Sequence, residues 1–249
     1  MRIPPVLFAV LVGLVLCQIG TLVTTVYLHR ALSHRALTLR PGLTWAFRVV
    51  TWIVTGIRPR QWVAVHRKHH AHTDVDGDPH SPLLEGFAAV QLGNVGLYRK
   101  VARDEAQVAR YARDLPADRW DRLFFDHALV GLGLGIAAMA VLWGPLVAGI
   151  AALTHTVSYL LLNAAVNAVG HVWGRQPFDN TAHNSQLLAL ATAGEGLHNN
   201  HHHLATSPRL SMAKGEIDPG WWFIAVARKL GWLTLRERKA EPIEEPIAA

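Results

Sequence analysis

Residues 128–170 form the longest uncharged stretch of the chain, and this stretch restricts the fold more than any other feature. It has 43 residues and contains no Asp, Glu, Lys or Arg. Gly144 and Pro145 divide it into two halves, each near the roughly 20 residues that a helix needs to cross a bilayer. The stretch therefore predicts a hairpin of two membrane-spanning helices, at residues 128–144 and 146–169.

A second apolar stretch, residues 3–28, lies near the beginning of the sequence and holds 26 residues without a charge. This length is sufficient for a transmembrane helix. A cleaved signal peptide is the alternative, since Arg2 precedes the stretch, but no small-residue cleavage site follows it. We therefore expect about three membrane-spanning helices in total.

Residues 43–57 are also apolar, but the segment is only 15 residues long and contains Arg48. It is too short to span a bilayer. We predict instead a helix that lies in the membrane interface, with Trp45 and Trp52 as anchors.

The basic residues are distributed unevenly about the predicted spans. Of the 24 Lys and Arg residues, 23 lie in segments that would share one face of the membrane, which the positive-inside rule identifies as cytoplasmic. The water-facing segments would be an insertion at 58–126 and a C-terminal part at 171–240, with a disordered tail at 241–249. The net charge of +6 comes without any nucleic-acid-binding motif, so we expect no nucleic-acid partner.

These patterns predict an all-α protein with a single domain at residues 1–240. It would be an integral membrane helical bundle with a helical cap on its cytoplasmic side, in the cytoplasmic membrane of a bacterium. Helical stretches such as 101–113 are expected in the insertion, with almost no strand. Cys17 is the only cysteine, which excludes an intrachain disulfide and a thiolate metal site.

Nine of the fifteen histidines fall into four short clusters that flank the apolar stretches. Two clusters have histidines at offsets of zero, three and four, which a helix brings to one face. Neutral imidazoles are good ligands for first-row metals. The clusters contain His29 and His34, then His66, His69 and His70, then Asn167 and His171, and finally His198, His201 and His202.

Histidine-rich sites without cysteine suit Zn, Cu, Fe or Ni. Nine imidazoles exceed the six ligands that one ion accepts, so we expect two ions. Zinc hydrolases usually need only three protein ligands. A pair of redox-active ions therefore points to iron and oxygen chemistry, and the position of the clusters at helix ends points to a lipid-borne substrate.

From about residue 26 to residue 233 the chain resembles the membrane-bound fatty acid desaturases of the stearoyl-CoA desaturase type. The order and spacing of the motifs carry the resemblance: H-x-x-x-x-H at 29–34, H-x-x-H-H at 66–70, DPHSP at 78–82, N-x-x-x-H at 167–171 and GEGLHNNHH at 194–202. It implies oxygen-dependent removal of two hydrogens from adjacent methylenes of a fatty acyl chain, carried by coenzyme A or a membrane lipid. Electrons would come from a ferredoxin or cytochrome with its reductase.

The resemblance also implies a catalytic centre of two Fe ions, with O2 as co-substrate. Asn167 would bind an ion through a water molecule. The nine histidine ligands would be His29, His34, His66, His69, His70, His171, His198, His201 and His202.

Further residues have two interpretations each. Glu195 either fixes the tautomer of a ligand imidazole or is an ordinary loop carboxylate. Trp62 either walls an acyl tunnel or anchors the chain at the interface. Arg99 and Lys100 either contact phosphates of the substrate or lie on a solvated helix. We expect the remaining histidines to be non-ligands: His72, His80, His127, His155, His183 and His203, of which His80 is placed to hold a loop beside the metals.

Two other functions stay open at this point. A hydroxylase acting on an alkane, sphingolipid or carotenoid would use the same scaffold. A non-catalytic metal-binding membrane protein is less compatible, because transporters tend to place ligands in mid-membrane and to repeat their halves. Family members usually have two spans before the first histidine cluster, whereas this chain has room for one. A second subunit of a homo-oligomer could replace the missing helix.

Overall fold

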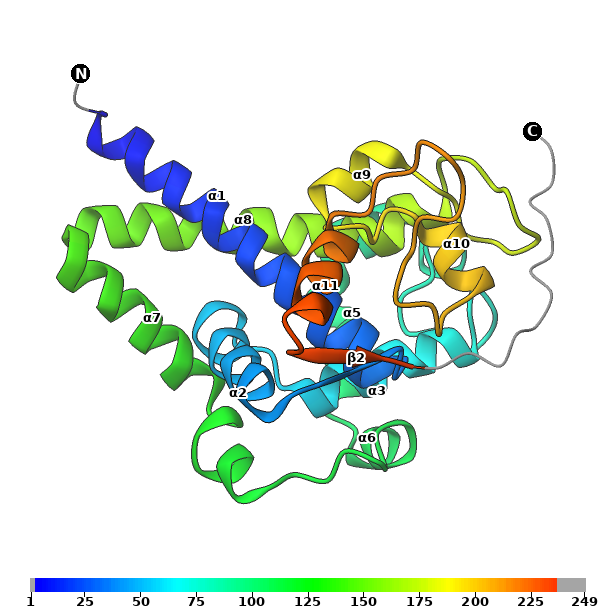
Figure 1. The fold of residues 1–249 in the computed structure, drawn as a ribbon, viewed down its shortest axis with the longest axis horizontal. Helices are drawn as coiled ribbons and strands as arrows, with labels where there is room; N and C mark the ends of the chain where they lie inside the picture. Colours follow the sequence, from blue (N-terminus) through cyan, green and yellow to red (C-terminus); the bar gives the residue numbers. More distant parts are fainter. Residues whose placement is uncertain (1–2, 237–249) are drawn as a thin grey trace.

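Three apolar helices form one end of the molecule: α1 (Pro5–Val23), α7 (Ala128–Trp143) and α8 (Pro145–Ala168). The structure, a computed structural model, describes residues 3–236. In Figure 1 the apolar helices extend to the left, whereas the histidine-bearing segments gather on the right. Arg2 and the tail predicted to be disordered at 241–249 lie outside the described residues.

Within residues 3–236, two helices are long and apolar enough to cross a membrane. α1 continues without a break into the π-helix η1 (Thr24–Ser33), which gives 29 helical residues, and α8 continues into the 3₁₀-helix η4 (Val169–His171), which gives 27. The first helix thus runs five residues past its predicted end at Leu28. α7 has 16 residues, or about 24 Å, which is shorter than a hydrocarbon core of about 30 Å.

The segment predicted as an interfacial helix forms α2 (Pro41–Val50) and a π-helical turn, η2 (Thr51–Thr55). η2 packs closely on α7. A Cβ atom added to Gly131 of α7 would lie only 2.6 Å from the Trp52 ring of η2. The charge of Arg48 is neutralised by ion pairs to Asp118 and Asp121 of the polar insertion. This pairing explains how an arginine is accommodated in an otherwise apolar segment.

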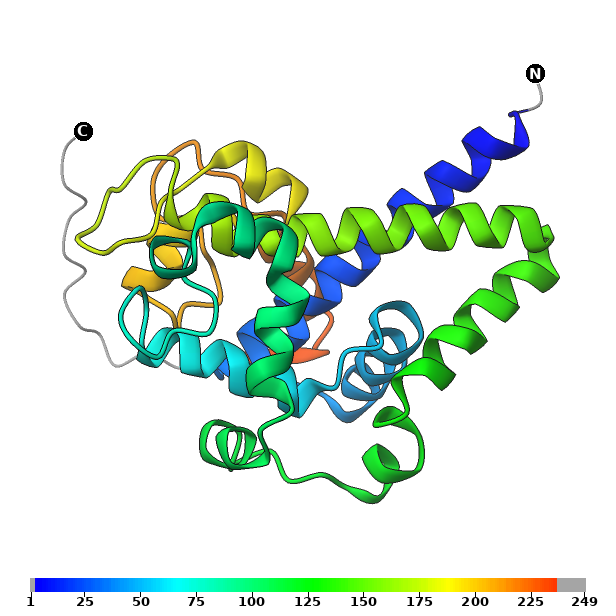
Figure 2. The same ribbon diagram turned by 180° about the vertical axis from the view of Figure 1, so that it is seen from behind.

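The insertion between η2 and α7 is helical: α3 (Pro59–Ala71), α4 (Pro82–Glu85), α5 (Phe87–Ala102), α6 (Glu105–Tyr111) and η3 (Asp121–Phe125). The helical stretch expected over 101–113 is formed by the end of α5 and by α6, with a break between them. Asp104 caps α6 by accepting hydrogen bonds from the N–H groups of Ala106 and Gln107, so a new helix begins there. Figure 2 shows α5 crossing the end of α8, where Val90, Leu97 and Ala168 pack together.

The C-terminal part adds α9 (Gln186–Ala191), α10 (His198–His203) and α11 (Pro219–Lys229). A small antiparallel sheet pairs β1 (Leu37–Leu39) with β2 (Leu233–Leu235), in agreement with the expectation of almost no strand. The largest apolar cluster joins η1, α2, α11 and β2 through Val26, Leu28, Phe47, Ile224 and Leu233. This cluster holds η1, which carries the first histidines, against the end of the chain.

Candidate metal centre

The π-helix η1 brings the first two histidines together. His29 and His34 are five residues apart, a spacing that an α-helix would turn through about 140°. A π-helix instead bonds residue i to residue i+5, and the His34 N–H donates to the His29 carbonyl at 3.1 Å. The two ring centroids consequently lie 4.8 Å apart.

The three-histidine clusters on α3 and α10 each divide between two neighbouring groups of imidazoles. Their spacing suggested that all three rings share one helix face, but adjacent residues of a helix point about 100° apart. His66 and His70 therefore face one group, whereas His69 faces the other. In α10, His201 faces the first group, and His198 and His202 face the second.

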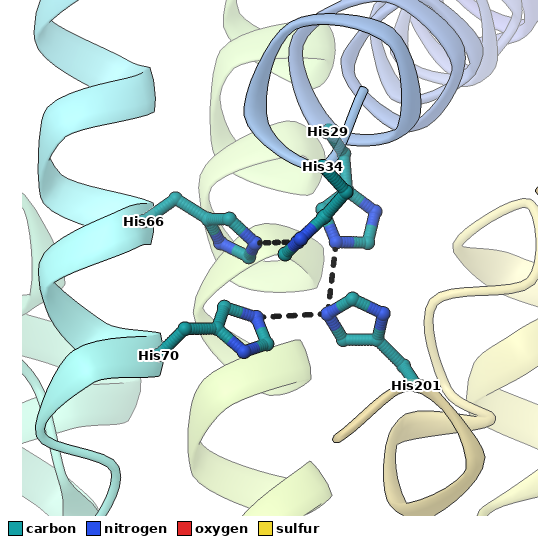
Figure 3. A group of neighbouring side chains, drawn as sticks. All are labelled: His29, His34, His66, His70 and His201. Carbon is teal, nitrogen blue, oxygen red and sulfur yellow. Dashed lines mark hydrogen bonds between the residues drawn. The ribbon is translucent and has the colours of Figure 1, made fainter. Parts of the chain in front are cut away.

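All nine predicted ligand histidines lie in these two groups, whose ring nitrogens lie within 4.8 Å of one another in each group. Figure 3 shows the rings of the larger group pointing toward one another from η1, α3 and α10. The five-histidine group consists of His29, His34, His66, His70 and His201. The four-histidine group consists of His69, His171, His198 and His202.

The Nε2 atoms form the centre of each group. In the five-histidine group, Nε2 of His201 lies 3.1 Å from Nε2 of His29 and 2.9 Å from Nε2 of His70. In the four-histidine group, Nε2 of His198 lies 3.0 Å from that of His171 and 3.2 Å from that of His202. In each group, segments that are far apart in the sequence thus present the same ring atom to a common point.

The arrangement fits metal ions better than hydrogen bonds among the rings. A neutral imidazole has a single N–H. In His29, His69 and His171 the Nδ1 atom lies 2.7 to 3.0 Å from a carboxylate, which places the N–H there and leaves a lone pair on Nε2. Several such lone pairs face one another, and a cation between them removes their repulsion. An all-imidazole donor set suits a first-row transition metal.

The protonation state of the imidazoles also suits metal binding. Burial, with a smaller contribution from His171, lowers the pKa of His69 to about 3. Burial likewise lowers the pKa of His66, His198 and His201 well below the ordinary value. These rings are neutral at pH 7 and can offer a lone pair to an ion.

Glu195 lies where a carboxylate that orients an imidazole is expected. Its Oε1 atom is 2.8 Å from Nδ1 of His29, and it also accepts a hydrogen bond from Thr25. The side chain is buried beside Arg30, whose Nε lies 3.9 Å away. The carboxylate thereby fixes the His29 ring with Nε2 toward the group.

Two further carboxylates, Asp74 and Asp78, orient the four-histidine group, and neither is among the site residues predicted from the sequence. Asp74 lies 2.7 Å from Nδ1 of His171, and Asp78 lies 3.0 Å from Nδ1 of His69. Burial alone would raise the pKa of Asp74, but hydrogen bonds from His171, Ser81 and Thr181 outweigh it and lower the pKa. The sequence holds a signal for this orienting role, because acidic residues recur within nine positions of the HRKHH cluster.

Asn167 and Trp62 both line a cavity of about 90 Å³ beside the histidine groups. Trp62 stacks on the ring of His66, with centroids 4.9 Å apart and an interplanar angle of 12°. Asn167 is half-buried and lies on α8. His80 also lines the cavity, and its ring lies 4.8 Å from that of His69.

Arg99 and Lys100 are exposed at the end of α5 and do not line this cavity. Lys100 borders a separate cleft of about 330 Å³, together with Lys68 and Asp78. The histidines outside the clusters lie outside the two groups. His80 shares a smaller group with His69 and Asp78, and the others are His72, His127, His155, His183 and His203.

Comparison with known proteins gives consistent matches. The family model for fatty acid desaturases matches residues 4–213. A Delta-9 desaturase-like 2 protein of Arabidopsis thaliana is 32% identical over 89% of this chain and 74% of its own length. An acyl-CoA Delta5-desaturase of Anemone leveillei is 33% identical over 86% and 69% of the two chains. A sn-2 palmitoyl-lipid 9-desaturase of Nostoc sp. (strain 36) is 30% identical over 82% and 72%.

The family match covers most of the chain and includes both histidine groups. The relatives are named as desaturases in plants and in a Nostoc strain. With two apolar helices of spanning length and two groups of buried imidazoles, the chain belongs to the fatty acid desaturase family of oxidoreductases.

Proposed function

We propose that the protein desaturates a fatty acyl chain at two Fe ions held by the nine clustered histidines. The observation that carries this proposal is the convergence of nine imidazole nitrogens in two adjacent buried groups of a fatty acid desaturase. Iron bound there would supply the redox chemistry, in which one O2, two electrons, two protons and two substrate hydrogens yield two waters. The chain's own residues bind the substrate, exclude water and hold the ligand rings.

The cavity of about 90 Å³ is the proposed position of the reacting methylenes. Its walls include Trp62, Val65 and Tyr98, and it reaches His66 and His198 of the two groups. Aromatic and branched side chains there exclude bulk water from the reacting carbons. Asn167 faces the same cavity, where its amide is suited to hold a water molecule near the four-histidine group.

A larger cavity, of about 790 Å³, is the proposed site for the substrate carrier. Arg58, Arg60 and Arg103 line it together with five carboxylates, of which Asp114, Asp118 and Asp121 are already paired with Arg67 or Arg48. The exposed Arg99 and Lys100 lie close to Arg103 in sequence. These cations are suited to the phosphates of coenzyme A or of a phospholipid. The named relatives include an acyl-CoA and an acyl-lipid enzyme, so both carriers belong to the proposal.

The proposed placement in the membrane has three spans, with α7 as the shortest, and puts the histidine groups on the cytoplasmic side. The uneven distribution of Lys and Arg supports this orientation. α2 then lies in the interface, and the segments 58–126 and 171–240 face the cytoplasm of a bacterium. A ferredoxin or cytochrome with its reductase would deliver electrons there, and a homo-oligomer would cover the apolar helices.

Product analysis separates desaturation from hydroxylation. The chain, with a matching reductase and electron carrier, is expressed in a bacterial host, and the fatty acids are profiled by mass spectrometry. Desaturation predicts products that lack two hydrogens. Products that gain an oxygen atom would favour the hydroxylase. The His66→Ala variant is expected to give neither product, whereas His203→Ala, which alters a ring stacked on Phe178, is the matched control.

A further inference from the structure

A buried arginine next to the first ligand histidine joins η1 to the C-terminal part of the chain. The Arg30 side chain is 1% exposed and makes a two-pronged ion pair with Asp218, at 2.9 and 3.0 Å. The same guanidinium donates to the carbonyls of Ala193 and Pro208. Asp218 in turn caps α11 by accepting from the Trp221 N–H. One side chain thus links the helix that carries His29 to both sides of the α10 segment.

Two glycines provide the space for this ion pair. A Cβ atom on Gly194 would lie 2.1 Å from Oδ1 of Asp218, and one on Gly220 would lie 2.8 Å from Nη2 of Arg30. Gly194 also has a φ of +107°, which side chains rarely adopt. The glycine that begins the GEGLHNNHH motif is therefore required by its backbone conformation and by the Arg30–Asp218 ion pair.

A second arginine, Arg67, joins α3 to η1 from the other side. Its Nε donates to the Ser33 carbonyl at 2.9 Å, and its Nη2 donates to the Leu32 carbonyl at 2.8 Å. These carbonyls lie at the end of the π-helix, where no later helical N–H group can donate a hydrogen bond to them. Asp114 holds the guanidinium in place with a bond to each Nη atom.

The two arginines differ in which histidine-bearing segments they connect. Arg67 bonds the end of η1, whose two rings belong to the five-histidine group alone, although α3 itself supplies rings to both groups. Arg30 connects η1 with the residues on either side of α10, which supplies rings to both groups. A guanidinium fork fixes orientation as well as distance, and a lysine ammonium does not.

We propose that Arg30 and Arg67 are positioning residues that hold the ligand rings in place before any ion binds. Arg67 sets the geometry of the five-histidine group alone, whereas Arg30 sets the geometry of both groups through α10. The inference rests on the proposed metal centre, and the metal content of the unaltered protein tests that centre separately.

Titration of the metal-free, full-length protein with Co²⁺ in lipid nanodiscs tests the proposal, with the visible absorption of bound Co²⁺ as the readout. Each group is studied in a background where the other is weakened: His171→Ala leaves the five-histidine group intact, and His34→Ala leaves the four-histidine group intact. Arg67→Lys is expected to weaken Co²⁺ binding about 10- to 100-fold in the first background only. Arg30→Lys is expected to weaken it in both backgrounds.

Arg48→Lys is the matched control, because Arg48 makes a similar two-pronged pair with Asp118 that contacts no histidine-bearing segment. It should leave Co²⁺ binding unchanged. Equal losses in Arg67→Lys and Arg48→Lys, or losses from Arg67→Lys at both groups, would overturn the proposal. Asp114→Asn, which leaves Arg67 unsupported, gives a second test: the proposal expects the same selective loss, and unaltered binding contradicts it. Fewer than two Co²⁺ ions on the unaltered protein would refute the metal centre itself.

Discussion

The two histidine groups share α3 and α10 but are supported in different ways. The five-histidine group has one orienting carboxylate, Glu195, and takes two rings from η1, which Arg30 and Arg67 join to neighbouring segments. The four-histidine group has two orienting carboxylates, Asp74 and Asp78, which come from a single turn after α3. It has one imidazole fewer, so an ion there has more room for an external ligand.

This difference indicates a division of tasks. Hydrogen bonds from imidazole N–H groups to carboxylates make the imidazoles more basic ligands, and two such bonds compensate in part for the missing ring. Asn167 and His198 border the same cavity. We therefore expect an ion in the five-histidine group to have more of its coordination positions filled by imidazoles, and an ion in the four-histidine group, whose rings are the more buried, to keep a position for water or a substrate-derived ligand.

The largest effect is expected from removing one ring of each group. His201→Ala removes the ring whose Nε2 lies 3.1 Å from that of His29 and 2.9 Å from that of His70. His202→Ala removes one ring of the four-histidine group. Each variant should form no detectable product and lose one of the two metal equivalents, measured by fatty acid profiling and elemental analysis. Retention of activity in His201→Ala would reject the assigned site, and loss of both equivalents from either variant would show that the groups are not independent.

A smaller effect is expected from neutralising the orienting carboxylates. Asp74→Asn should lower metal affinity at the four-histidine group, and Glu195→Gln should lower it at the five-histidine group, by about 10- to 100-fold each. Competition with a chromophoric chelator measures both affinities. The double variant Asp74→Asn, Asp78→Asn should lose more metal affinity at the four-histidine group than Glu195→Gln loses at the five-histidine group. Equal effects at both groups from any one of these changes would remove the distinction between them.

Acid should destabilise the metal-free protein. The unfolded chain protonates its histidines near pH 6.5, whereas burial lowers the pKa of His69 and of His80 to about 3 in the folded chain. Between these values the unfolded state binds more protons, so the free energy of unfolding decreases as the pH falls from 7 toward 3. Chemical denaturation at several pH values measures this slope. A stability that increases on acidification contradicts neutral, buried rings.

The smallest effect is expected outside both groups. Arg99→Ala and Lys100→Ala should raise KM by less than about tenfold, because exposed ion pairs contribute about 0–1 kcal/mol each. Neither kcat nor metal content should change, and the difference from the unaltered enzyme should shrink at high salt. A decrease in kcat with constant KM would instead connect α5 to the histidine groups.

Much of the fold can be predicted from the lengths of the uncharged stretches and from the positions of glycine and proline. Residues 128–170 and the stretch that begins at Ile3 are largely helical, as expected for apolar segments whose backbone groups would have no other partners in a bilayer. The division at Gly144 agrees with its φ of +88°. The sequence does not show where α1 changes to a π-helix, since residues 24–33 contain no Gly or Pro to mark the change. The extent of the first helix was therefore underestimated.

The candidate site was predictable in membership but not in arrangement. Spacing identified nine histidines, yet it placed His66, His69 and His70 on one face, whereas α3 divides them between two groups. The orienting role of Asp74 and Asp78 was not predicted, since Asp, Gly and Pro at close spacing also form ordinary turns. Long-range contacts such as Arg30 with Asp218 leave no periodic pattern in a sequence.

Anomalous diffraction at the iron absorption edge, from crystals of the iron-loaded protein, tests the central claim most directly. The account predicts two iron peaks, one among the Nε2 atoms of the five-histidine group and one among those of the four-histidine group. A single peak, or peaks away from these nitrogens, would contradict it.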